Sequence, residues 1–214
     1  LETLNVPFYK VASAENIHFP LLKKIVKTKK PIIISTGMIS IKELDEVVLY
    51  VRKLGCKDIT LLKCTTEYPA SPKDSNILTI PFLKKRYKCN VGLSDHTSGI
   101  GAAIAAIAHG ATVIEKHLTL SRKDGAIDSF FSLEPNEFRL LVKESKTAFE
   151  SLGKIKINAS KSEKKYLKYR RSIYVAEDIK KGEKFTKVNL KVIRPGLGLH
   201  PKIYETVIGK KSKK

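Results

Sequence analysis

The chain has 214 residues, of which 42% are apolar and 29% are charged, a composition that excludes a disordered or fibrous protein. It contains no apolar run of the roughly 20 residues that cross a bilayer, and it begins without the pattern of a secretory signal. We therefore expect a cytoplasmic protein with no membrane partner. The three cysteines form no CxxC pair, so we expect them to be reduced and buried.

The charge is strongly positive, with 41 Lys and Arg against 21 Asp and Glu and a net charge of +20. Residues 154–214 hold 19 basic and 5 acidic residues, whereas residues 1–153 hold 22 and 16. Such an excess attracts nucleic acid when it gathers on one face. These lysines are scattered and lack interleaved aromatic side chains, so we expect solvated lysine faces and no nucleic-acid partner. An anionic small substrate is compatible with this charge.

Strand-like runs alternate with helical patterns over residues 1–153, which predicts a parallel α/β sheet with crossover helices. The predicted strands are 8–12, 31–35, 59–64, 90–93 and 112–115, and the predicted helices are 20–28, 40–55, 75–87, 99–110 and 134–153. Residues 154–169 are polar and basic, as is typical of a linker or an extended arm. Residues 170–214 are strand-like with glycine turns, which predicts a second, small, β-rich module.

Polar side chains follow each predicted strand of the first module. Because functional groups of parallel α/β folds gather at the carboxyl ends of the strands, we expect these side chains to form a site. Lysine and hydroxyl groups suit a phosphate and a carboxylate, although strand-end serines can also simply cap the next helix. The residues concerned are Lys10, Ser13, Ser35, Thr66, Tyr68, Ser94, His96, Glu115 and His117.

Two histidines end neighbouring strands. His96 and His117 belong to strands about 5 Å apart, so both imidazoles could reach one divalent cation such as Mn, Fe or Zn. Glu115 faces the same side as His117 by strand alternation and is placed for acid or base work, whereas Lys116 is expected to point away. Asp128, in the long loop before the last predicted helix, could accept hydrogen bonds from sugar hydroxyls.

Six segments of the chain stand out, namely KVASAEN, PIIISTGM, KCTTEYPAS, VGLSDHTSGIGAAIAAIAHGATVIEKHLTL, DSFFSLEP and RPGLGLHP. Together they resemble the sialic acid synthase family of phosphoenolpyruvate-dependent nonulosonate synthases. Within that family, CTTEYPA and DSFFSLEP are most similar to the pseudaminic acid synthases, and Thr66 stands where N-acetylneuraminate synthases more often have Asn. N-acetylneuraminate and legionaminate synthases are the alternatives.

The resemblance implies a fold. Residues 1–153 correspond to strands 4–8 of a TIM (β/α)8 barrel, and residues 170–214 to an antifreeze-like (SAF) domain that stops short of its last strands. On this reading the chain is a fragment without the first three barrel strands, and we expect it to be inactive alone. An inactive carbohydrate-binding fragment, or a phosphoenolpyruvate synthase acting on another sugar, is the remaining alternative.

The resemblance also implies roles. The reaction is the condensation of phosphoenolpyruvate with an open-chain 2-acetamido sugar, with release of phosphate, in a homodimer that exchanges its SAF domains. Glu115 is expected to move protons, and His96 and His117 to hold Mn²⁺, with Mg²⁺ or Co²⁺ as alternatives. Phosphoenolpyruvate is expected at Lys10, Ser13, Ser35, Thr66 and Ser94, and the sugar at Tyr68, Asp128 and the partner subunit's Arg194.

Overall fold

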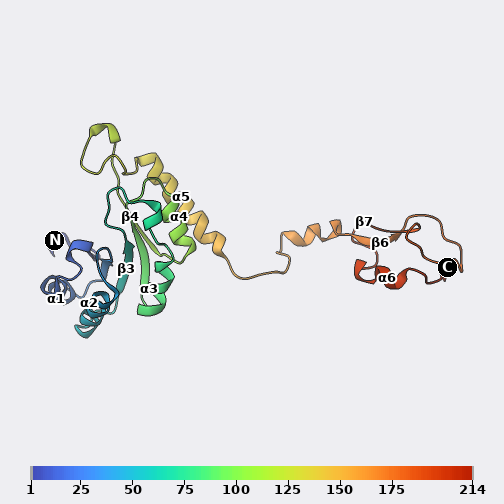
Figure 1. Cartoon of the computed structure of the whole chain (residues 1–214), viewed down its shortest axis with the longest axis horizontal. Coiled ribbons are helices and arrows are strands. Elements are labelled where there is room, and N and C mark those ends of the chain that lie inside the picture. The colour runs from blue at the N-terminus through green and yellow to red at the C-terminus, as the bar shows by residue number, and fades with distance from the viewer. Residues whose placement is uncertain (1, 214) are drawn as a thin grey trace. The chain divides into compact units, whose positions relative to one another are not determined.

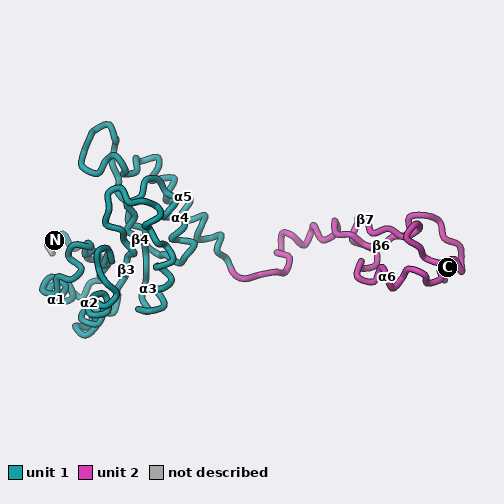
Figure 2. The backbone as a smooth tube through the Cα atoms, in the orientation of Figure 1, with its two compact units in different colours: residues 1–153 teal, residues 154–214 magenta. Residues whose placement is uncertain are grey.

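The computed structural model describes residues 2–213. They divide into two compact units, unit 1 up to Gly153 and unit 2 from Lys154 (Figure 2). Among the residues described, no helix is both long enough and apolar enough to cross a membrane.

Unit 1 alternates strands and helices along the whole of its length. The strands all run parallel in the order β1-β2-β3-β4-β5, so the predicted α/β sheet is confirmed and forms part of a barrel. The elements are β1 Tyr9–Val11, α1 Phe19–Lys27, β2 Ile32–Ser35, α2 Ile41–Lys53, β3 Ile59–Cys64, α3 Thr79–Tyr87, β4 Asn90–Asp95, α4 Gly101–Ala108, β5 Val113–Lys116 and α5 Pro135–Leu152.

Helix boundaries follow the capping residues of the sequence. Ser40 Oγ accepts a hydrogen bond from Glu43 N at 3.3 Å, and Glu43 Oε2 accepts one from Ser40 N at 2.8 Å, which forms a capping box at the start of α2. The helix ends before Gly55, whose φ of +95° is a conformation that glycine adopts without strain. The termini of this helix are therefore encoded locally.

The core of unit 1 lies between the sheet and its helices. The stripe Leu44, Val47, Val48 and Val51 of α2 is buried, as its spacing predicts. Each such side chain contributes about 1.5–3 kcal/mol through removal of apolar surface from water. The helices α3 and α4 pack beside β4, and α5 lies along α4 (Figure 1). This packing fixes the positions of the strand ends.

The cysteines depart in part from the expectation. All three are free, but only Cys64 is buried, whereas Cys56 and Cys89 are half-buried. The physical reason is their position. Cys56 and Cys89 lie in the segments that lead into β3 and β4 and pack against the outside of the core, whereas Cys64 is the last residue of β3.

Unit 2 is a small β-rich module. Its strands β6 Ser172–Val175 and β7 Leu190–Ile193 pair antiparallel, and a short helix α6 Tyr204–Val207 follows. The last residues of the predicted linker instead form a 3₁₀-helix, Glu163–Tyr169. Its start is stabilised by mutual hydrogen bonds between Ser160 and Glu163. This capping pattern is present in the sequence as Ser-x-x-Glu.

Candidate functional site

Side chains from β1 and β4 meet at Glu115, the third residue of β5. Lys10 Nζ of β1 lies 3.3 Å from Glu115 Oε2, and Ser94 Oγ of β4 donates a hydrogen bond of 2.7 Å to Glu115 Oε1. The Glu115 side chain is 39% exposed. Both carboxylate oxygens are thus held by protein donors while the group is still open to a substrate.

His96 and His117 lie next to each other beyond Glu115. Their ring centroids are 5.2 Å apart and their planes are inclined at 79°. His96 Nδ1 lies 2.8 Å from the carbonyl oxygen of Thr65, which can only accept a hydrogen bond. Nδ1 therefore carries the proton, and the lone pair of His96 Nε2 is left for another partner. His117 Nδ1 lies 3.9 Å from Asp128 Oδ2.

The two imidazoles have opposite pKa shifts. Burial pushes the pKa of His96 down, but hydrogen bonds with Cys64 and with the Thr65 carbonyl outweigh burial, so the pKa is raised. Burial lowers the pKa of His117, and the charge of protonated His96 lowers it further. His117 is therefore the imidazole that stays neutral as the pH falls, which is the form that binds metals.

Cys64 belongs to the same cluster, a contact that sequence reasoning missed. Its Sγ lies 4.0 Å from His96 Nδ1 and 3.8 Å from Thr66 Oγ1. Burial raises the pKa of this thiol, but hydrogen bonds with His96, Ser13 and Ser94 outweigh burial and bring the pKa to about 7. The position of Cys64 at the end of β3, directly before the polar run Thr65 and Thr66, was the available signal.

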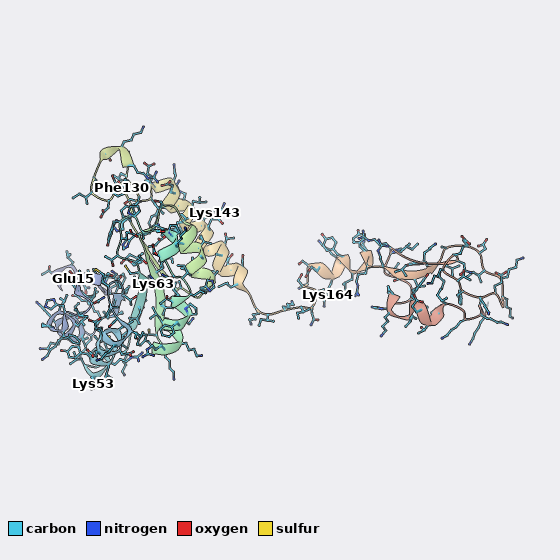
Figure 3. All side chains as sticks on the ribbon, viewed as in Figure 1. Glu15, Lys53, Lys63, Phe130, Lys143 and Lys164 are labelled. Carbon is cyan, nitrogen blue, oxygen red and sulfur yellow. The ribbon has the colours of Figure 1, made fainter. Side chains whose placement is uncertain are left out.

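Aromatic rings surround the histidine pair. Tyr68 contacts His96 with centroids 4.2 Å apart, and Phe131 contacts His117 at 4.9 Å. Burial raises the pKa of Tyr68, so its hydroxyl stays protonated. Phe131 is 2% exposed and was not among the predicted site residues. The adjacent Phe130, at the end of unit 1 opposite Lys53 in Figure 3, is exposed.

Hydroxyl groups form a second part of the site. Ser13 Oγ accepts a hydrogen bond of 3.1 Å from Gly37 N, and Ser35 Oγ is buried without a hydrogen-bond partner. A Cβ on Gly37 would lie 2.1 Å from Thr66 Oγ1 and 2.6 Å from Ser13 Oγ, so only glycine fits between these hydroxyls. Asn16 fixes the loop by donating to the carbonyl of Gly37 at 3.0 Å. A buried hydroxyl without a partner is suited to a ligand oxygen.

A divalent cation needs several donor groups directed at one point. Across residues 2–213, no group of three or more His, Cys, Asp or Glu could hold a metal ion. The two imidazoles with one fixed tautomer fit a cation that keeps its remaining positions for water or substrate oxygens. The residues present therefore fit an open site and do not fit a closed structural one.

Two of the residues predicted to contact the sugar, Asp128 and Arg194, lie in different units of the chain. Asp128 lies in the loop between β5 and α5, next to His117, and so joins the cluster. Arg194 directly follows β7 in unit 2. Its predicted contact with a sugar stays a prediction.

Residues 1–157 match the NeuB family, and residues 170–214 match the SAF domain. The chain belongs to the NeuB family. Pseudaminic acid synthase of Helicobacter pylori is 41% identical over 216 residues, covering 100% of this chain and 63% of that protein. N,N'-diacetyllegionaminic acid synthase of Campylobacter jejuni is 42% identical over 213 residues, covering 98% and 64%. This NeuB family chain thus spans less than two thirds of these relatives.

Solved structures agree with this membership. The N-acetylneuraminic acid (sialic acid) synthetase of Leptospira borgpetersenii in complex with citrate is similar with a TM-score of 0.72 and 34% identity. The match covers 79% of this NeuB family chain and 59% of that chain. This chain accordingly shares its fold with that sialic acid synthetase over the covered part.

Proposed function

We propose that the strand-end cluster of unit 1 serves the condensation of phosphoenolpyruvate with an open-chain 2-acetamido sugar, as in a pseudaminic acid synthase. The observation that supports this most is Glu115, held between Lys10 and Ser94 beside the two histidines. A carboxylate placed in this way can move protons next to an anionic substrate. The similarity to pseudaminic acid synthases supports the choice of substrate class.

Phosphoenolpyruvate carries a phosphate and a carboxylate, and each oxygen needs donors. Lys10 supplies a positive charge, and the hydroxyls of Ser13, Ser94 and Thr66 gather around Cys64 in the same cluster. Ser35 supplies a buried hydroxyl that lacks a protein partner. Donors aimed at fixed positions stabilise charge without reorganisation during the reaction.

The proton movements follow from the bonds that change. The enol carbon C3 of phosphoenolpyruvate forms a bond to the aldehyde carbon, and water adds at C2 before the C2–O bond to phosphate breaks. The attacking water loses one proton, and the aldehyde oxygen gains one. The hydroxyl left on C2 loses the second proton as the C2=O bond forms, and that proton leaves with the phosphate. Glu115 accepts the first proton, and its hydrogen bond with Ser94 and ion pair with Lys10 hold it at the strand ends.

The proposal includes a divalent cation, and we propose that it is Mn²⁺. His96 and His117 would hold it, and when bound it would polarise the aldehyde oxygen as a Lewis acid. Tyr68 and Asp128, which contact the histidine pair, would orient the sugar. Contact of the partner subunit's Arg194 with the sugar, in a homodimer exchanging SAF domains, is the part of the proposal that concerns unit 2.

A legionaminic acid synthase is the second candidate, because one such relative is 42% identical to this chain. The two candidates differ in the sugar that condenses with phosphoenolpyruvate. This sugar is the product acid without the three carbons that come from phosphoenolpyruvate. Calorimetric titration with each sugar, at saturating phosphoenolpyruvate, separates them. The proposed assignment requires tighter binding of the sugar from which pseudaminic acid is made.

Binding of phosphoenolpyruvate to the 214-residue chain tests the proposal directly. Calorimetry with phosphoenolpyruvate, inorganic phosphate and pyruvate compares recognition of both ends with recognition of one. We expect phosphoenolpyruvate to bind more tightly than either part. Equal affinities for phosphate and phosphoenolpyruvate would refute the proposed pocket.

Metal binding is tested separately by electron paramagnetic resonance of Mn²⁺. His96→Ala and His117→Ala should each release the ion, whereas His109→Ala, at the exposed end of α4, should not. Retention of Mn²⁺ by both site variants would refute the metal assignment. Calorimetry would still test the binding of phosphoenolpyruvate independently.

A further inference from the structure

A second pair of charged residues lies at the same strand ends, behind the cluster. Asp95 of β4 and Lys116 of β5 are register partners, and Lys116 Nζ lies 2.8 Å from Asp95 Oδ2. Both side chains are only 1% exposed. Strand alternation turns them away from Ser94, Glu115 and the histidines. None of the proposed chemical steps uses them.

Thr97 completes this buried unit. Asp95 Oδ1 accepts hydrogen bonds from Thr97 N at 2.9 Å and from Thr97 Oγ1 at 2.8 Å. Lys116 Nζ also donates to the carbonyl oxygen of Thr97. The three residues therefore join the end of β4, the turn after it and the end of β5 into one network that water does not reach.

Stability alone gives a weak reason for such a pair. Two charges removed from water lose much of their hydration, and apolar residues of similar volume are often as stabilising as a buried ion pair. What a charged, hydrogen-bonded pair does provide is a defined geometry. Asp95 stands between Ser94 and His96, and Lys116 stands between Glu115 and His117. A shift of this pair moves all four site residues together.

The exposed contacts of the site cannot fix the geometry in the same way. The Lys10–Glu115 pair is partly open to water, and its members are the groups that a substrate would engage. The hidden pair keeps its partners when the site is filled. We infer that Asp95 and Lys116 are positioning residues, which lock the ends of β4 and β5 so that Ser94, His96, Glu115 and His117 converge. The choice of phosphoenolpyruvate as the ligand that tests this inference rests on the proposed function.

The test replaces the pair by apolar residues, in the double variant Asp95→Leu with Lys116→Met. We expect the variant to fold with a lowered melting temperature, because Thr97 N and Thr97 Oγ1 lose their buried acceptor. Relief of the buried charge offsets part of this loss. The affinity for phosphoenolpyruvate should fall by about tenfold or more, the effect typical of residues that orient a site from behind. Asp45→Asn, which removes a carboxylate from the surface ion pair with Arg86, should leave this affinity unchanged.

Side-chain NMR of the histidines gives a readout that does not need a ligand. The imidazole signals of His96 and His117 should move in the double variant, while those of His18, His109 and His200 stay in place. A folded double variant with unmoved signals and unchanged affinity would overturn the inference. If the unmodified chain fails to bind phosphoenolpyruvate, the proposed function fails, and the histidine signals still decide this inference.

A single substitution covers the case in which the double variant does not fold. Asp95→Asn keeps an oxygen for the two Thr97 donors and puts an amide NH2 group, which cannot accept, in place of the oxygen that accepts from Lys116. The negative charge and the hydrogen bond from Lys116 are both lost. It should shift the same two histidine signals and weaken phosphoenolpyruvate binding. Unchanged signals in this folded variant would equally overturn the positioning role.

Discussion

Lys10 and Glu115 stand on the two edge strands of an open five-stranded sheet, yet their charged groups are 3.3 Å apart. In a flat sheet, four steps of about 4.8 Å would separate β1 from β5 by about 19 Å. The sheet is therefore curled, and side chains from its two edges meet over the concave side. This curvature is what makes one site from residues spread over more than 100 positions of the chain.

Ser35→Ala should separate stability from binding. The buried hydroxyl has no protein partner, so its removal should raise the free energy of unfolding by up to about 1 kcal/mol. The loss of a hydrogen bond to a charged ligand should weaken phosphoenolpyruvate binding by about tenfold or more. Denaturant unfolding and calorimetry measure the two effects.

Ser40→Ala is the matched control for that change. Ser40 caps α2, so its loss should lower the free energy of unfolding by about 1 kcal/mol and leave the affinity unchanged. If both serine variants lost stability and neither lost affinity, Ser35 would be a structural residue only.

Gly37→Ala tests the close approach of the loop to the hydroxyl pocket. The new methyl group would lie 2.1 Å from Thr66 Oγ1, so Thr66 and Ser13 must move. We expect a loss of about 1–3 kcal/mol of stability from this overpacking and a clear loss of phosphoenolpyruvate affinity.

Gly101→Ala provides the comparison, because a Cβ there meets nothing within 4 Å. Because residue 101 lies in α4, this substitution should raise the free energy of unfolding by up to about 1 kcal/mol. Equal binding by both alanine variants would contradict the assignment of the Gly37 loop to the pocket.

Asp45 predicts a pH dependence of stability away from the site. Hydrogen bonds from Arg86 Nε and Tyr87 Oη, each 2.9 Å long, lower the pKa of Asp45 from its ordinary value of 3.8. A lowered pKa gives stability that is present above the unfolded value and is lost as the pH falls through the folded value. Asp45→Asn should therefore be less stable than the unmodified chain at pH 7.

The same comparison in acid completes this prediction. At a pH well below the lowered pKa of folded Asp45, the unmodified chain also carries a neutral Asp45, so the difference in free energy of unfolding should disappear. Urea unfolding at several pH values measures it. A difference that stayed constant with pH would show that the charge of Asp45 contributes nothing.

Much of the fold could be predicted because its signals are local. The apolar stripe of α2, the cap at Ser40 and the strand Ile59–Cys64 each depend on neighbouring residues and periodicity. The candidate site was also accessible in outline, since parallel strands bring their carboxyl ends to one edge of the sheet.

The contacts that were missed connect residues distant in sequence. The proximity of Cys64 to His96 and the packing of Phe131 on His117 depend on the curvature of the sheet and on a loop path, neither of which has a spacing rule. The direction of Lys116 followed from alternation, but its buried partner Asp95 could not be inferred without the strand register. The 3₁₀-helix after Ser160 could have been predicted, because its capping pattern is present in the sequence.

The most direct test of the central claim is phosphoenolpyruvate calorimetry with two matched lysine variants. Lys10→Met removes the charge at the strand-end pocket, and Lys53→Met removes an identical charge at the end of α2. We predict that Lys10→Met weakens binding by about 10- to 100-fold, as the loss of a charged hydrogen bond requires, and that Lys53→Met binds like the unmodified chain. Equal binding by both variants would contradict the site described for this chain.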